Sequence, residues 1–154
     1  MALSDPDKKV VISILNSIQE TELAGVVRYT HYSLMTCGFG RNPIVKWLRQ
    51  QAGERLRRAQ EAGELVTHLD GHPSLAIGDL LETYKHDVGA ILRESLSHED
   101  LARGLYEELL ARVAGRSVIL EEYARRMIAE EERHASEVNK MLRLPGRIPA
   151  FADA

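Results

Sequence analysis

A glutamate and a histidine three residues apart, Glu131 and His134, interrupt an apolar helical stripe near the carboxyl end of the sequence. At 3.6 residues per turn they share one helix face with apolar neighbours, namely Leu120, Ala124, Met127, Ile128, Ala135, Val138 and Leu142. A buried carboxylate beside an imidazole needs a compensating partner, and a metal ion is a common one. The pair therefore predicts an internal metal site, unless the glutamate only pairs with an arginine.

Two further glutamates fall among apolar residues at helical spacing, and a tyrosine follows each of them. Glu22 precedes Tyr29 by seven residues, and Glu99 precedes Tyr106 by the same seven. Seven residues are about two helical turns, so each tyrosine lies on the same face as its glutamate. Two separate helical segments are therefore expected to carry the same inward pair.

The chain consists of two corresponding halves. Counting 33 and 36 residues on from the inward glutamate of the first half reaches Arg55 and Arg58. Counting 32 and 35 residues on from that of the second half reaches Glu131 and His134. The first half therefore has Arg-x-x-Arg where the second has Glu-x-x-His.

Hydrophobic periodicity predicts the elements that position these residues. Four long amphipathic helices are expected, over residues 8–36, 43–70, 87–113 and 117–143. The 154 residues, 44% hydrophobic and 28% charged, suit one globular domain. The expected fold class is all-α, as a left-handed four-helix bundle.

Helix caps mark four of these boundaries. Ser4, followed by Asp5-Pro6, predicts the start of the first helix, and Asn42 before a proline predicts the start of the second. Gly71 predicts the end of the second helix, because glycine readily forms a carboxyl-terminal cap. Ser117 predicts the start of the fourth.

The connection between the second and third helices has two interpretations. Residues 74–86 either begin a helix at Asp79 or cross the bundle in an extended form. An extended run of ~13 residues at ~3.3 Å each reaches about 43 Å, whereas a helix of ~26 residues is roughly 39 Å long. The connection can therefore traverse the bundle, which makes the third helix parallel to the second.

Charge and composition exclude several classes of function. A formal net charge of -3 argues against nucleic acid as the main partner. The single cysteine, Cys37, excludes an internal disulfide, and no secretion signal or membrane-spanning stretch is expected, so the expected location is the cytoplasm. The remaining histidines are expected at the surface or in loops: His31, His68, His72, His86 and His98.

Several segments resemble the bacterioferritins, a branch of the ferritin-like proteins. They are Leu15-Asn16 with Glu22-Leu23-Ala24, Tyr29 and Met35; Arg58-Ala59 through Gly71-x-Pro73; Asp87-Val88 with Leu92-Arg93; and Glu131-x-x-His134. The resemblance covers about residues 10–143 and rests on spacing along the chain more than on one motif. It implies a ferritin-like four-helix bundle with a long crossover between helices 2 and 3.

The resemblance also implies a metal site. In that family two helices each give one glutamate, and the other two each give Glu-x-x-His, to a di-iron centre. By position, the implied metal ligands are Glu22, Glu99, Glu131 and His134. Iron is the implied cofactor, as a di-iron centre or a single ion. Tyr29 and Tyr106 are the implied catalytic residues, as electron or hydrogen-bond donors in the oxidation of ferrous iron.

Two ligand positions depart from the family pattern, because Arg55 and Arg58 stand there. Arginine has no acceptor atom and stays protonated, so neither is expected to bind iron. Three glutamates supply a charge of -3, the two arginines supply +2, and a protonated His134 would supply +1, which sums to zero without metal. The arginines are therefore expected to occupy the cation positions as bidentate ion pairs with these glutamates. Glu54 points some 100° away by the ~3.6-residue period and is not expected to substitute.

Other departures concern haem and assembly. Leu56 stands where the family has its haem-binding methionine, so haem is not expected. The bundle is expected to occupy residues 1–146, with residues 147–154 as a short tail without the fifth helix of the family's cage. Either an interface between copies or a wider core would explain four apolar residues on the flanks of the inner faces: Tyr32, Val45, Trp47 and Leu56.

The expected function is therefore linked to iron. The leading hypothesis is iron binding, storage or oxidation by a homodimer or larger homo-oligomer with a degraded di-iron centre. The alternative is a metal-free structural or regulatory bundle that pairs with itself or with an active ferritin chain.

Overall fold

The computed structural model describes residues 2–80 and 82–143 of the chain. It contains four helices: α1 (Asp5–Met35), α2 (Arg41–His68), α3 (Val88–Val113) and α4 (Val118–Leu142). No strand occurs in the described residues. The all-α prediction is confirmed, and each predicted helix end lies within three residues of the observed one. The predicted tail over residues 147–154 lies outside the described residues.

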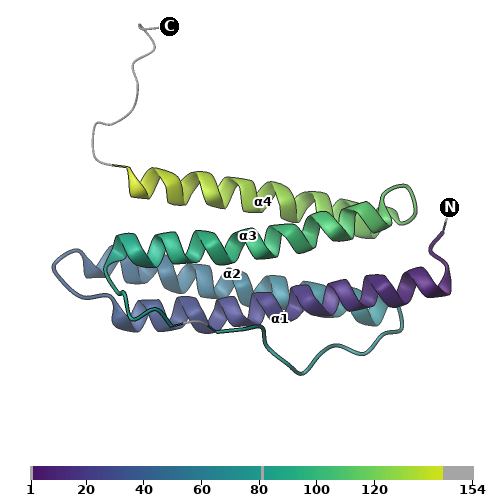
Figure 1. The fold of residues 1–154 in the computed structure, drawn as a ribbon, viewed down its shortest axis with the longest axis horizontal. Helices are drawn as coiled ribbons and strands as arrows, with labels where there is room; N and C mark the ends of the chain where they lie inside the picture. Colours follow the sequence, from purple (N-terminus) through teal and green to yellow (C-terminus); the bar gives the residue numbers. More distant parts are fainter. Residues whose placement is uncertain (1, 81, 144–154) are drawn as a thin grey trace, which may run out of the picture.

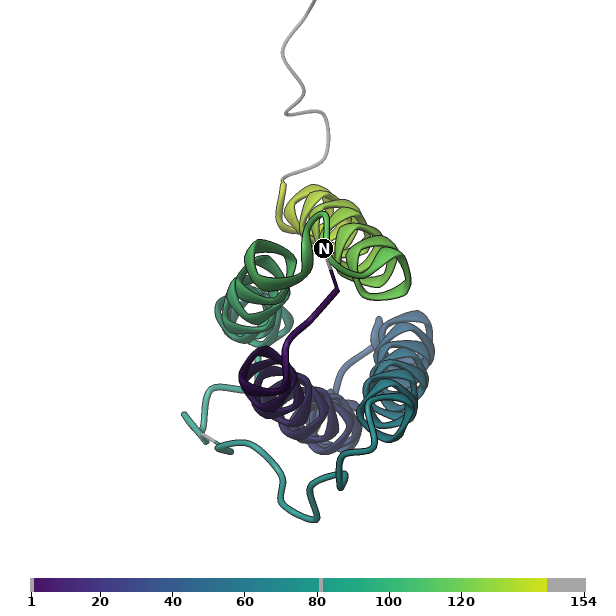
Figure 2. The ribbon, with the colours of Figure 1, turned by 90° about the vertical axis from the view of Figure 1, so that its right-hand side faces the viewer.

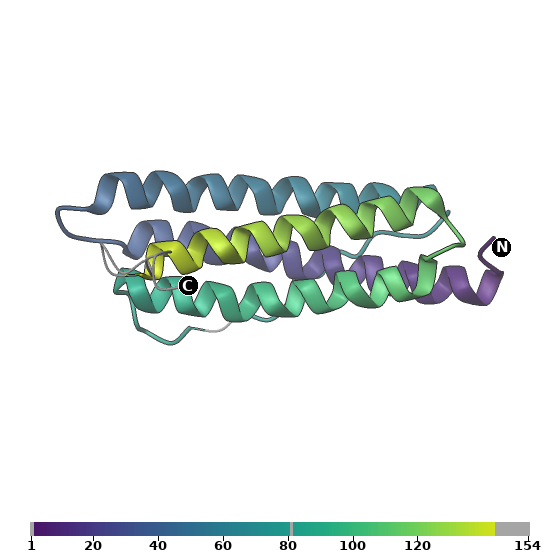
Figure 3. The same cartoon turned by 90° about the horizontal axis from the view of Figure 1, so that it is seen from above.

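The four helices form a bundle in which α3 runs parallel to α2. Figure 1 shows α1 and α2 antiparallel, followed by a crossover that returns along the bundle before α3 begins. Seen from the end in Figure 2, the helices surround a common axis, and the crossover lies outside α1 and α2. Figure 3 shows α4 antiparallel to α3. The predicted long crossover is therefore confirmed, with no helix in its described part, residues 69–80 and 82–87.

Side-chain caps fix the helix starts as predicted in two cases out of three. Ser4 accepts the Asp7 N–H in a capping box at α1, and Ser117 accepts the Leu120 N–H at α4. The prediction that Asn42 caps α2 is wrong, because that helix begins two residues earlier, at Arg41, and Gly40 is its cap residue. The last residues of α1 therefore join α2 through a turn without a side-chain cap at α2.

The end of α2 differs from its prediction in one residue. Asp70, and not Gly71, takes the left-handed conformation, with φ of 61°. The Gly71 N–H donates to Val66 O at 2.9 Å and the Asp70 N–H to Thr67 O at 3.0 Å, which together make a Schellman motif. Gly71 is needed for another reason, since a Cβ there would lie 2.9 Å from Ile12 Cδ1. The chain therefore leaves α2 pressed against α1.

Two apolar clusters fill the bundle, one on each side of a layer of buried charged residues. This polar layer consists of Glu22, Arg55, Arg58, Glu99 and Glu131. The larger includes Leu15, Leu109 and Met127, and the smaller is formed by Tyr29, Tyr32, Leu48 and Ile91. Along α1, α2 and α3 the polar layer falls between these clusters, whereas α4 contributes only to the larger one. Of the four flanking apolar residues, Tyr32 and Val45 are buried in the core, whereas Leu56 is 43% exposed.

The first helix is long and apolar enough to span a membrane by length and composition alone. The sequence analysis expected no membrane-spanning stretch and did not single out Asp5–Met35. In the bundle this helix packs against α2 and α3, and its inner face buries Glu22 and Arg28. A core helix meets the same criterion, and α1 is such a helix.

Asn16 fastens the start of the crossover to α1, which gives a testable prediction. Its amide donates to His72 O at 3.1 Å and accepts the Ser74 N–H at 2.9 Å. Each such bond contributes about 1 kcal/mol net, so Asn16→Ala should speed amide exchange near Ser74 roughly tenfold. Hydrogen exchange measured by mass spectrometry would show this effect, with unchanged protection in the centres of the helices. The exposed Asn139→Ala on α4 is the matched control; equal exchange in both variants would contradict this anchoring.

Candidate functional site

The polar layer brings together charged side chains from all four helices, one glutamate each from α1, α3 and α4 and two arginines from α2. Glu22 comes from α1, Glu99 from α3 and Glu131 from α4, and these carboxylates are 1%, 5% and 2% exposed. Arg55 and Arg58 come from α2 and are also buried. The sequence spacing therefore placed all five groups correctly on inner helix faces.

The Arg55 guanidinium lies at the centre of the layer. Its Nη1 is 3.4 Å from Glu22 Oε2, 2.8 Å from Glu99 Oε2 and 2.7 Å from Glu131 Oε1. The aliphatic stem of Arg55 passes over Gly25 on α1, where a Cβ would lie 3.0 Å from Arg55 Cγ. One nitrogen thus contacts all three carboxylates. The predicted ion pairs are present, but their predicted bidentate geometry is wrong, because Arg55 Nε has no hydrogen-bond partner.

Arg58 supplies the second positive charge at the α4 side of the layer. Its Nη1 donates to Glu131 Oε1, and its Nη2 lies 3.3 Å from Glu130 Oε2. Glu130 is a partner that sequence reasoning missed, because its position on α4 adjoins the inner stripe without belonging to it. Glu54 is exposed and pairs with Arg57 at 2.8 Å, so it takes no part in the layer, as expected.

The two tyrosines donate hydrogen bonds across the bundle. Tyr29 Oη donates to Glu99 Oε1 at 3.0 Å, and Tyr106 Oη donates to Glu22 Oε1 at 3.3 Å. The helices α1 and α3 are antiparallel, so the same seven-residue spacing in each lets every tyrosine reach the glutamate of the other helix. Burial raises the pKa of both phenols well above the usual value, which keeps them protonated as donors.

His134 lies at the edge of the layer beside aromatic groups. Its Nε2 is 3.2 Å from Tyr29 Oη, and its ring stacks on Trp47 with 6.0 Å between centroids and 6° between planes. Burial, followed by the positive charge of Arg55, lowers the pKa of His134 to about 4. The charge sum that counted a protonated His134 therefore does not apply at pH 7, where this imidazole is neutral.

A proton on a carboxyl group lowers the negative charge of the layer, in place of the positive charge that a protonated His134 would have supplied. Burial, followed by repulsion from Glu131 and Glu22, raises the pKa of Glu99 to about 8 against the attraction of Arg55. Burial also raises the pKa of Glu22. For Glu131 burial acts in the same direction, but Arg55, Arg58 and a hydrogen bond with Glu99 lower its pKa overall.

The two arginines supply the fixed positive charge of the layer. A pKa of about 8 favours the protonated form of Glu99 at neutral pH, whereas His134, with a pKa of about 4, is uncharged. Glu131, whose pKa is lowered, is ionised beside both arginines. A proton on a carboxyl therefore takes the role that the sequence analysis assigned to the histidine.

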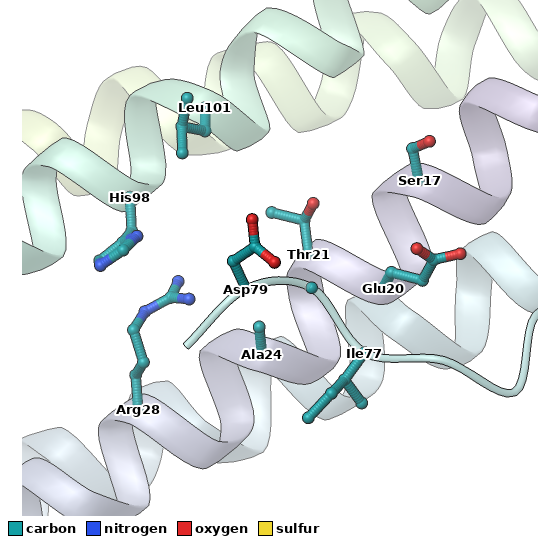
Figure 4. Close-up of a pocket in the computed structure, with 10 residues that line it drawn as sticks. Ser17, Glu20, Thr21, Ala24, Arg28, Ile77, Asp79, His98 and Leu101 are labelled. Atoms are coloured by element: carbon teal, nitrogen blue, oxygen red, sulfur yellow. The ribbon is translucent and has the colours of Figure 1, made fainter. Parts of the chain in front are cut away.

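A second polar region lies outside the layer, between α1, the crossover and α3. It is a cavity of about 410 Å³ whose lining includes Glu20, Arg28, Asp79 and His98. Figure 4 shows the side chains of Arg28 and His98 pointing toward each other there. His98 is 8% exposed, so its expected surface location is wrong, and burial lowers its pKa. The helical position of His98, beside inward Glu99, was the available signal.

Comparison with known proteins identifies the fold independently. A family model described as a ferritin-like domain matches residues 12–148. No curated protein matches the sequence.

Several solved structures share the architecture. A structure described as a ferritin-like, diiron-carboxylate protein from Bacillus anthracis has 22% identity and a TM-score of 0.84, covering 92% of this chain and 100% of that one. The dodecameric thioferritin of Bacteroides fragilis has 23% identity and a TM-score of 0.80, covering 91% and 86%. A Rhodobacter capsulatus bacterioferritin, described with a metal-free dinuclear site, has 21% identity and a TM-score of 0.78, covering 92% and 86%. At these identities the likeness concerns the fold.

The central contacts of Arg55 predict a large loss of stability when this side chain is removed. Arg55→Ala leaves three buried carboxylates without their common partner, which should cost roughly 3–5 kcal/mol. The neighbouring Arg57 is 48% exposed, so Arg57→Ala should cost less than about 1 kcal/mol. Chemical denaturation of both variants checks the difference. Similar small losses in both would mean that the Arg55 contacts do not stabilise the bundle.

The lowered pKa of His134 predicts a loss of stability in acid. The imidazole has a pKa of 6.5 when unfolded and about 4 when folded, so the unfolded chain binds more protons between these values. Its contribution is fully present above about pH 6.5 and falls by on the order of 3 kcal/mol as the pH drops to about 4.

Denaturation curves between pH 7.5 and pH 4, with His134→Gln beside the parent, isolate this contribution. The variant should lose less stability in acid than the parent, because glutamine does not titrate. The exposed His68→Gln is the control and should follow the parent. Parallel curves for the parent and His134→Gln would show that this imidazole titrates normally.

Proposed function

This chain belongs to the ferritin-like domain family, and we propose that it is an iron-linked member in which Arg55 and Arg58 replace the metal centre. In this proposal the chain does not itself oxidise ferrous iron. It serves as a subunit of a ferritin-like assembly, formed with copies of itself or with a metal-binding ferritin-like chain.

The contacts of Arg55 Nη1 carry this proposal. A di-iron centre needs two cation positions among four carboxylates and two imidazoles. Here a guanidinium nitrogen lies within 3.4 Å of all three inward glutamates. Arginine offers no acceptor atom to a metal, and its fixed charge repels one. The residues present therefore do not fit a two-metal centre.

The tyrosines fit the same interpretation. Tyr29 and Tyr106 donate to Glu99 and Glu22 and thereby satisfy acceptors that would otherwise be buried without partners. We assign them a structural role, as donors that orient the carboxylates toward Arg55. No catalytic step is needed to explain their positions.

Family membership supports the link to iron and to assembly. The Bacillus anthracis neighbour is described as a diiron-carboxylate protein and the Bacteroides fragilis neighbour as a dodecamer. In this chain α1 and α2 expose apolar residues, among them Val27, Leu34 and Leu56, at 43%, 62% and 43%. Burying such residues between subunits would stabilise an oligomer.

A second candidate function is oxidation of ferrous iron at a reduced site. It is favoured by the convergence of Glu22, Glu99 and Glu131 in one layer, with His134 at its edge. The two candidates differ in whether the unmodified chain binds iron in the layer.

Restoring the family pattern tests the proposal. The parent should consume no dioxygen above the buffer rate when ferrous iron is added. The double variant Arg55→Glu with Arg58→His recreates the second Glu-x-x-His and should bind two more iron ions per chain. It should also oxidise ferrous iron faster than the parent. Iron analysis and oxygen consumption measure these outcomes.

The control adds a carboxylate to the same helix outside the layer. Arg57→Glu should bind no more iron than the parent, because its side chain is exposed. Stoichiometric binding of two iron ions by the parent would overturn the proposal and favour the second candidate. Light scattering on the same preparations reports assembly, and a monomeric parent that also does not join a metal-binding ferritin-like chain would contradict the subunit role.

A further inference from the structure

Two histidines and a glutamate meet on the outside of the bundle. His31 lies on α1, whereas Glu82 and His86 belong to the crossover. Glu82 Oε2 is 2.5 Å from His31 Nε2, and Glu82 Oε1 is 3.3 Å from His86 Nε2. One ligand atom from each residue lies within 4.8 Å of the other two.

The crossover backbone is shaped to bring this cluster together. Tyr84, between the two crossover ligands, has φ of 58°, in the left-handed region that side-chain-bearing residues seldom adopt. Its N–H donates to Glu82 Oε1 at 2.6 Å, which turns the chain so that His86 returns toward Glu82. Asp87 then caps α3 by accepting the Ala90 N–H at 3.0 Å. The cluster therefore rests on a strained turn held against the start of a helix.

The three side chains are available to a ligand from solvent. The exposed fractions are 44% for His31, 31% for Glu82 and 23% for His86. The Tyr84 N–H, followed by the two histidines, lowers the pKa of Glu82, so this carboxylate is ionised at neutral pH. A carboxylate and two imidazoles are the donor set that zinc and other divalent first-row transition ions prefer.

We propose that His31, Glu82 and His86 form a surface site for a divalent transition-metal ion, with zinc as its reference ligand. The site is separate from the polar layer and goes beyond the proposed function. Three protein donors leave the fourth tetrahedral position to water. A bound ion would fasten the crossover to α1 through side chains from both segments.

The present geometry is close to that of a tetrahedral site. Metal bonds of about 2.0–2.1 Å place tetrahedral ligand atoms about 3.4 Å apart. The Glu82–His86 separation already has this value, at 3.3 Å. Small rotations of exposed side chains would widen the 2.5 Å separation between His31 and Glu82 and bring His31 and His86 to the same spacing, because their ligand atoms lie within 4.8 Å. No movement of the helices is required.

Zinc titration of the tag-free chain tests this site. Competition with a chromogenic chelator should show one zinc ion per chain, and His31→Ala, His86→Ala and Glu82→Gln should each weaken binding at least about tenfold. Zinc should also slow amide exchange over residues 82–87 in the parent but not in His31→Ala. This second measurement reports the predicted link between the crossover and α1.

The exposed His68→Ala removes a histidine at the end of α2 and is the matched control, which should bind zinc as the parent does. Equal zinc affinity in the parent, His31→Ala and His86→Ala would overturn the proposal, as would the absence of zinc binding by the parent. Iron oxidation by the parent would overturn the proposed function without altering the effect of these variants on zinc. The two proposals therefore fail separately.

Discussion

The bundle depends on one buried cation held among carboxylates. Three glutamates from three helices point into the same layer, where low dielectric makes unpaired negative charge very costly. Arg55 contacts all three carboxylates through a single nitrogen. Gly25 has no side chain, so the aliphatic stem of Arg55 can lie against α1. Without a positive group at this point, these glutamates could share the interior only by taking up protons. The layer therefore links the fourth helix to the other three.

The polar layer also explains why the two halves of the chain are alike in structure and unlike in charge. Tyr29 and Tyr106 make equivalent hydrogen bonds across the antiparallel pair α1 and α3. The other two helices differ, since α2 contributes two arginines and α4 contributes Glu131 and His134. The two arginines of α2 thus face the carboxyl groups of the other helices. A buried polar layer of this kind can also fix the register of the helices.

The crossover is held in place by contacts other than those of the polar layer. Its long extended path makes α3 parallel to α2 and places residues 69–80 and 82–87 along the outside of the bundle. Its contacts with α1 include hydrogen bonds, such as those of Asn16 with His72 and Ser74. Such a segment has a low cost of local opening compared with a core helix. A cation bridge to α1 would act on this part of the fold and leave the layer unchanged.

The sequence by itself determined the helices and the face on which each polar residue lies. Periodicity defined four amphipathic segments, the seven-residue spacing placed two glutamate and tyrosine pairs inward, and Arg-x-x-Arg occupied two expected ligand positions. Only the tertiary structure decided which groups meet, because periodicity specifies a face and not a partner. In the folded chain His134 contacts Tyr29 and Trp47. Burial and neighbouring charges raise the pKa of Glu99 and lower that of His134, so Glu99 and not the histidine favours the protonated form. The tertiary structure also brought His31 beside Glu82 and His86, which no helical spacing predicts, because a left-handed turn at Tyr84 forms their meeting point.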